Sequence, residues 1–145
     1  MKYLLLISLC CAACLPTRQV TESIRQPAFD SRETTRYQVT IQVRQALITG
    51  IMIVKHARDE WRGSLINEFG VKAFDFIVNG ERCRVLNAIS FLDRWYIRRV
   101  IASDITLLCG GRARKGKYLE SLPGGGFLLK NEKHHIIYTF KPVNP

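Results

Sequence analysis

The sequence lacks the motifs of several well-known enzyme classes. It contains no Gly-x-Ser-x-Gly nucleophile elbow. Its Gly- and Lys-rich stretch runs into Gly116-Lys117-Tyr118, where a P-loop needs Ser or Thr after the lysine. The acidic residues stand at no spacing that suggests paired acid–base catalysis. We therefore expect a protein that is not an enzyme and that needs no cofactor.

Metal-ligand spacings are missing from the body of the chain. Cys83 and Cys109, the two cysteines outside the N-terminal stretch, have no Cys or His partner at a zinc-binding spacing. His134 and His135 are adjacent, and neighbouring side chains of a strand point to opposite faces, so the two cannot chelate one ion. His56 falls in a predicted turn. We interpret the three histidines as surface residues and expect no metal site.

Acidic residues are scarce: 12 Asp and Glu stand against 22 Lys and Arg, a net charge of +10. Such a charge favours anionic partners, and alone it would suggest nucleic acid. The densest basic group lies near the C-terminal strands and is a candidate for contacts with anionic headgroups; it comprises Arg112, Arg114, Lys115 and Lys117. The alternative is a merely solvated charged loop.

No apolar run near the N-terminus is long enough to span a bilayer. Tyr3 to Ala13 has eleven residues, or about 16 Å of helix, against a hydrocarbon core of about 30 Å. Lys2 precedes the run, and two alanines end it. A cationic start, a short apolar core and a small-residue exit predict an export signal. Export excludes nucleic acid as a partner and leaves lipid phosphates.

Ala12 and Ala13, directly before Cys14, resemble the lipobox of bacterial lipoproteins, although Cys11 stands where that motif usually has Leu. The resemblance implies cleavage after Ala13, a diacylglycerol on the Cys14 thiol and an acyl chain, such as palmitate, on its new amino group. Leu15, where Asp would favour inner-membrane retention, favours the outer membrane, facing the periplasm. The alternative is an ordinary secretory signal that leaves Cys14 unmodified.

The chain divides into three parts: a signal peptide over 1–13, a polar tether over 14–35 and one domain over 36–145. A domain of this size buries roughly two-thirds of its unfolded surface, enough for one core. Removal of the signal takes only Lys2 from the charged residues and leaves +9. Cys83 and Cys109 remain, either paired in an oxidising compartment or as two buried thiols.

Alternating apolar residues predict an antiparallel sheet. The first strand covers 36–43, where Tyr, Val, Ile and Val alternate with polar residues. Gly50 suggests a bulge or bend in the second strand, and Asn79-Gly80 predicts a type I′ hairpin turn. Further strands are predicted over 46–55, 60–69, 71–78, 81–86, 117–122, 127–130 and 134–141.

Between the fifth and sixth predicted strands the apolar period becomes helical. Phe91, Trp95 and Ile101 fall on one stripe. Ser90 and Asp93 resemble a capping box, and Gly110-Gly111 ends the segment. A second start at Ser103-Asp104 leaves one long helix or two short ones. We expect an α+β fold: a curved antiparallel sheet, an unclosed half-barrel, with helix over its concave face.

Two stretches, Thr49–Lys55 and Asn67–Phe76, make residues 36–110 resemble the sheet of LolA/LolB-like proteins, the periplasmic carriers and outer-membrane receptors of lipoproteins. The resemblance implies a concave apolar face, covered by helices, that receives acyl chains. The candidate lining residues also suit a plain packed core; they are Ile41, Ile51, Ile53, Trp61, Phe74, Phe76 and Trp95.

These observations lead to a functional expectation with two rivals. We expect a membrane-anchored periplasmic lipoprotein that holds an acyl chain or lipoprotein cargo between sheet and helix. The first rival is a structural or assembly lipoprotein with a filled core, which binds a protein partner through a sheet edge or its basic face. The second is an enzyme with a histidine and a carboxylate converging in a cleft. A solvent-connected cavity favours binding, and a filled core favours the first rival.

Overall fold

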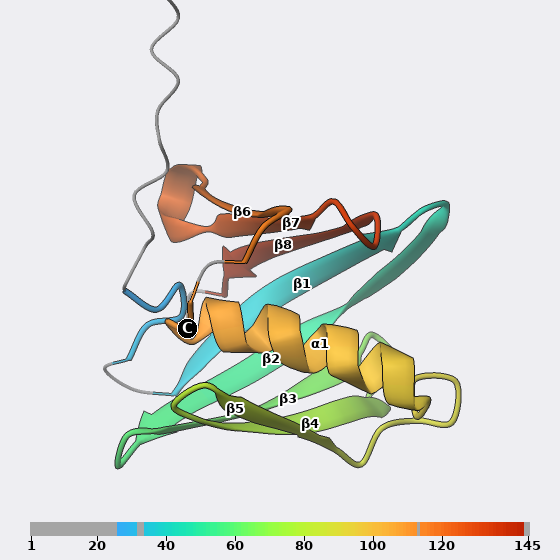
Figure 1. Cartoon of the computed structure of the whole chain (residues 1–145), viewed down its shortest axis with the longest axis horizontal. Helices are drawn as coiled ribbons and strands as arrows, with labels where there is room; N and C mark the ends of the chain where they lie inside the picture. Colours follow the sequence, from blue (N-terminus) through green and yellow to red (C-terminus); the bar gives the residue numbers. More distant parts are fainter. Residues whose placement is uncertain (1–25, 32–33, 113, 144–145) are drawn as a thin grey trace, which may run out of the picture.

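A computed structural model describes residues 26–31, 34–112 and 114–143. Eight strands form one antiparallel sheet in the order β5-β4-β3-β2-β1-β8-β7-β6. β5 and β6 are its two edges, so the sheet is not closed (Figure 1). The predicted α+β class and the unclosed antiparallel sheet are confirmed. The signal peptide, Ala13, Cys14 and most of the tether lie outside the described residues.

The elements follow one another through short connections, apart from the two that flank the helix. In chain order they are β1 (Thr35–Val43), β2 (Ala46–Ala57), β3 (Glu60–Asn67), β4 (Lys72–Asn79), β5 (Arg82–Leu86), α1 (Trp95–Leu108), β6 (Lys117–Ser121), the 3-10 turn η1 (Pro123–Gly125), β7 (Phe127–Asn131) and β8 (Ile136–Pro142).

β1 lies in the middle of the sheet, paired with β2 on one side and β8 on the other. Its alternation has the predicted consequence: Tyr37, Val39 and Ile41 are buried on one face. Gly50 of β2 is not a bulge, because the pairing runs through it without a break. It is a close approach instead, since a Cβ there would lie 2.4 Å from the Ile66 carbonyl oxygen.

The turns differ from the predicted ones by small shifts. Asn79 pairs with Arg82, so the β4–β5 loop is Gly80-Glu81 and not Asn79-Gly80. Only the glycine of that loop has positive φ, at 58°. His134 and His135 belong to the β7–β8 turn, because β8 begins at Ile136.

α1 is a single helix that begins at Trp95, later than the sequence suggests. The predicted capping box is wrong: the backbone N–H of Asp93 donates to the Ile89 carbonyl in a turn before the helix. The Asp93 carboxylate pairs with Arg98 at 3.0 Å. The predicted second start is also wrong, because Asp104 lies inside the helix and is fully buried.

α1 crosses one face of the sheet between the two edge strands (Figure 1). Ile101, Ile105 and Leu108 are buried in the same core as the inward residues of the central strands, among them Val39 and Met52. This core is the hydrophobic contact that holds the two layers together.

Candidate functional site

Phe29 joins the N-terminal segment to the core. It is buried, and it contacts four rings with centroid distances of 5.5 to 6.1 Å, those of Tyr37, Trp61, Phe127 and Phe140. The backbone N–H of Ala28 donates to the Leu108 carbonyl at the end of α1, at 2.8 Å. Residues 26–31 therefore belong to the folded domain and lie across the end of the core. The sequence prediction had placed them in a tether.

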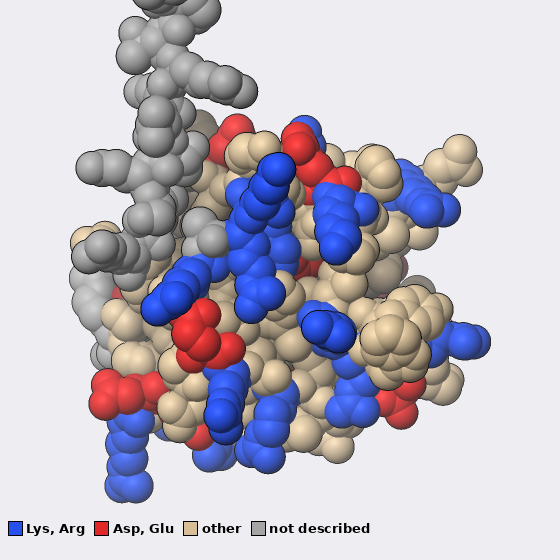
Figure 2. All heavy atoms as spheres, in the orientation of Figure 1, with Lys and Arg blue, Asp and Glu red and all other residues tan. Residues whose placement is uncertain are grey.

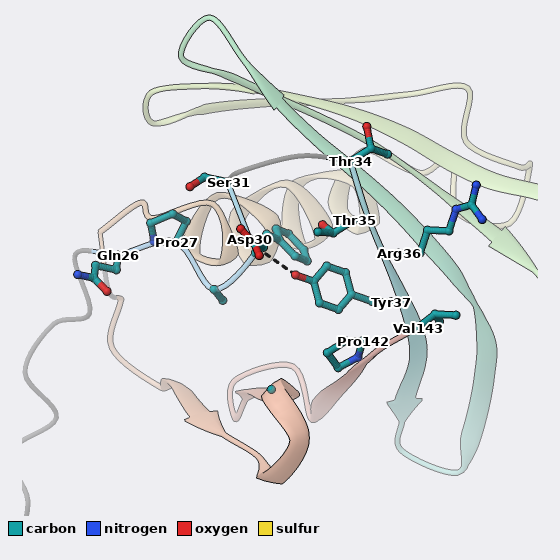
Figure 3. Close-up of a pocket in the computed structure, with 13 residues that line it drawn as sticks. Gln26, Pro27, Asp30, Ser31, Thr34, Thr35, Arg36, Tyr37, Pro142 and Val143 are labelled. Atoms are coloured by element: carbon teal, nitrogen blue, oxygen red, sulfur yellow. Dashed lines mark hydrogen bonds between the residues drawn. The ribbon is translucent and has the colours of Figure 1, made fainter. Parts of the chain in front are cut away.

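A groove of about 1320 Å³ opens between this segment and the sheet (Figure 3). Tyr37 points from β1 toward the segment, and its hydroxyl oxygen accepts a hydrogen bond from the backbone N–H of Asp30 at 3.0 Å. The groove beside Phe29, as we call it, is lined by Gln26, Pro27, Ala28, Phe29, Asp30, Ser31, Thr34, Thr35, Arg36, Tyr37, Gly125, Pro142 and Val143.

The groove combines apolar residues with polar and charged ones, among them Ser31, Thr34 and Arg36. Pro27, Pro142 and Val143 supply apolar surface, while the Phe29 side chain itself is buried. The Thr35 hydroxyl is buried and has no hydrogen-bond partner among the described residues. A buried polar group without a partner is rare in proteins. The wall of the groove therefore contains one buried, unpaired hydroxyl.

The predicted cavity residues do not meet at one cavity. Ile41, Trp61, Phe74 and Phe76 are buried in the packed core, and none of them lines the groove. Phe76 fills the space beside Gly63, where an added Cβ would lie 2.3 Å from its ring. The inner face of the sheet is thus packed with its own side chains where these four residues lie.

The other three predicted residues lie away from the core. Ile51 and Ile53 are on the opposite face of β2 from the buried Met52, and Ile51 is 36% exposed. Trp95 is 75% exposed at the first position of α1. The predictions that Trp95, Ile51 and Ile53 line an interior cavity are therefore wrong. The apolar stripe of the helix is the one that contains Ile101, Ile105 and Leu108, and Trp95 lies off it, about 120° around the helix from Ile101.

The predicted basic group is also divided. Arg112 and Arg114 are exposed, as is Lys115, and can meet solvent anions. Lys117 cannot, because its ammonium group lies 2.5 Å from a carboxylate oxygen of Asp104 and its side chain is only 9% exposed. The prediction of Lys117 as an anion contact is wrong for this reason.

Asp104 is the centre of a buried polar cluster that the sequence analysis missed. Its carboxylate accepts hydrogen bonds from the Asn131 amide at 2.8 Å and the Tyr138 hydroxyl at 2.7 Å. The Lys117 ammonium, which pairs with Asp104, also donates to Ser103 at 2.7 Å. The cluster ties α1 to β6, β7 and β8. The signal was present in the sequence, since Asp104 falls on the stripe of Ile101 and Leu108.

Burial and charge change the acidity of three groups near the helix. Burial, with the neighbouring Asp104 carboxylate, raises the pKa of Tyr138 well above its ordinary value. Burial raises the pKa of the Cys83 thiol to about 12. Burial and then the nearby Cys83 raise the pKa of Cys109. Both cysteines are free thiols, the second of the two possibilities left open above.

No protein-family model matches the chain, and no curated protein matches it. Within the part of the chain that the structure describes, no three His, Cys, Asp or Glu residues gather as metal ligands would. The same part contains no helix with the length and apolar character needed to cross a membrane.

Proposed function

We propose that the protein is a lipid-anchored, non-enzymatic protein of the bacterial outer membrane, facing the periplasm, that binds an acyl chain in the groove beside Phe29. The proposal retains the LolA/LolB-like resemblance, with α1 covering the concave face of the sheet. It moves the binding site from the interior to the edge of the core. The observation that carries it is the groove itself, with apolar surface from Pro142 and Val143 and the buried, unpartnered Thr35 hydroxyl in its wall.

An acyl chain with a polar head fits this chemistry. Each methylene buried against Pro27, Pro142 and Val143 contributes about 0.8 kcal/mol. If the wall of the groove opens to the buried Thr35 hydroxyl, a carboxyl or ester oxygen of the head can accept a hydrogen bond from it, which removes the cost of leaving that hydroxyl unpaired. The acyl chain would supply the affinity, and the Thr35 hydroxyl would orient the head.

The position of the groove in the chain suits cargo from the membrane. Gln26 lines the groove, twelve residues after the predicted anchor Cys14. A fully extended segment of that length spans at most about 40 Å. The proposed anchor therefore keeps the groove within about one bilayer thickness of the lipid surface.

A second candidate is a structural or assembly lipoprotein without a ligand. The specific observation in its favour is the filled core, since Phe76, Phe140 and Met52 are almost completely buried between sheet and helix. In this case a sheet edge would bind a protein partner. The two candidates differ in whether the groove takes up lipid.

Binding of a fluorescent fatty acid to the purified Cys14→Ser chain separates the two. We expect saturable binding at one site and about tenfold weaker binding in Val143→Asp, which places a charge in the apolar wall. Thr35→Val should weaken binding about two- to tenfold without loss of stability, because it removes an unpaired hydroxyl. Thr40→Val, on the other face of β1, is the matched control and should bind as the unaltered chain does. No uptake, or equal uptake by all variants, would favour the second candidate.

A further inference from the structure

Large exposed apolar side chains gather near the start of α1. Phe91 and Trp95 lie just before and at its first turn, followed by the half-exposed Tyr96. Phe69 and Val71 occupy the β3–β4 turn, where Phe69 is 81% exposed. We call these five residues the aromatic end. None of them lines the groove beside Phe29.

The fold brings the two halves of the aromatic end to one edge of the molecule. The β3–β4 turn lies directly before Lys72, the first residue of β4. The backbone N–H of Ile89 donates to the Ala73 carbonyl at 2.9 Å, which fixes the loop from β5 to α1 beside the start of β4. α1 begins six residues later, at the same end of the sheet (Figure 1).

Positive charge surrounds these apolar residues. Residues 68–72 and 87–99 contain four cations and two acids, Glu68 and Asp93. One of the cations, Lys72, pairs with Asp75 at 3.1 Å. Asp93 is paired with Arg98, whose guanidinium also donates to the Val85 carbonyl of β5. Arg94 and Arg99 remain exposed and pair with no carboxylate of the described residues. Figure 2 shows a group of uncharged residues over the start of α1, with Lys and Arg on either side and acidic side chains below it.

We propose that the aromatic end docks on an anionic phospholipid surface. Trp and Tyr favour the boundary between headgroups and acyl chains. Apolar and aromatic side chains next to Arg are the pattern of proteins that lie in that boundary. Phe69 and Trp95 enter the boundary, and Arg94 and Arg99 contact lipid phosphates. Exposed apolar patches also serve protein partners, but the unpaired cations complement phosphate.

The docking surface does not depend on the groove, and its test can fail independently. The chain has two tryptophans, the buried Trp61 and the exposed Trp95. Vesicles of phosphatidylglycerol should shift the fluorescence of the Cys14→Ser chain to shorter wavelength. Bromine on the acyl chains of the vesicles should quench it. The matched variant Trp95→Phe, which keeps Trp61, should show neither change.

The charges are tested in the same assay. Each arginine near an anionic surface strengthens partition about fivefold, so Arg94→Ala with Arg99→Ala should weaken it about 25-fold. Lys55→Ala with Lys141→Ala, two exposed cations elsewhere, should leave the quenching of Trp95 unchanged. The proposal is overturned if vesicles bind the chain but leave Trp95 unquenched, which is the result expected when the aromatic end binds a protein instead. It is also overturned if neutral phosphatidylcholine quenches Trp95 equally.

Discussion

Asp104 shows how one buried charge fixes the position of a helix. A carboxylate loses its hydration when it is buried, and the loss is tolerable only when its oxygens are fully occupied. Here Asn131, Tyr138 and Lys117 occupy them, one from each of the three C-terminal strands. An apolar residue could pack in the same place, but it could not specify these three partners.

The substitution Asp104→Asn should destabilise the fold by about 3–5 kcal/mol, because it leaves the Lys117 ammonium buried without a counter-charge. Urea denaturation followed by circular dichroism measures the change. Asp93→Asn removes an exposed ion pair with Arg98 and should cost at most about 1 kcal/mol. Equal effects of the two variants would show that the buried pair is not the stabilising contact.

Alkaline pH should destabilise the folded chain through its buried acids. The pKa of Tyr138 is raised in the fold, so an unfolded chain releases that proton near pH 10 while the folded chain keeps it. The stabilisation that this retained proton gives the fold is complete below pH 10 and is lost as the pH rises above 10 toward the pKa of Tyr138 in the fold. Above pH 10 the free energy of unfolding should fall less steeply with pH in Tyr138→Phe than in the unaltered chain, by about 1.4 kcal/mol per pH unit. Identical slopes would contradict the assignment.

At the scale of the element, α1 has a start that is poor for helix stability. Arg94 is its N-cap and makes no side-chain capping bond, and the first turn holds no acidic residue. A cation at this end also opposes the helix dipole. Burial of the apolar face around Ile105, not the cap, holds the helix in place. A start that is unfavourable for stability suits the proposed contact with phosphate.

A substitution at Arg94 should therefore raise the stability of the fold and weaken vesicle docking at the same time. Arg94→Asp supplies a capping carboxylate and should stabilise the fold by about 1 kcal/mol, while it weakens partition to phosphatidylglycerol vesicles. Arg99→Asp, which lies inside the helix and cannot cap it, should weaken partition without the gain in stability. Thermal denaturation and vesicle sedimentation measure the two quantities. A stabilised Arg94→Asp that binds vesicles normally would contradict the role of Arg94.

Strand positions in the whole molecule could be predicted because their signal is local. The alternation from Tyr37 to Val43 sets which face of β1 is buried before any partner is known. The pairing of β1 with β8 joins residues about a hundred positions apart, and no local pattern contains it. The start of the helix was only partly predictable. Ser90 and Asp93 form a local capping pattern, but in the fold a turn closed by the Ile89 carbonyl takes its place.

The candidate site was the least predictable part for the same reason. Phe29 is the one large apolar residue between Ile24 and Tyr37, so no period marked it as a core residue. Trp95 was placed on the apolar stripe of the helix with Phe91, but Phe91 lies before the helix and Trp95 lies about 120° around it from Ile101. The apolar pattern placed the helix correctly, but the start of the helix decides which of its side chains face the sheet.

The central claim is that an acyl chain binds in the groove beside Phe29, and nuclear magnetic resonance tests it most directly. Palmitate is titrated into the isotope-labelled Cys14→Ser chain, and the backbone amide shifts are assigned to residues. We predict shifts confined to residues 28–31, 34–37 and Val143, and their loss in Val143→Asp. Shifts centred on Met52 and Val54, inside the core, or no shifts at saturating palmitate, would contradict the claim.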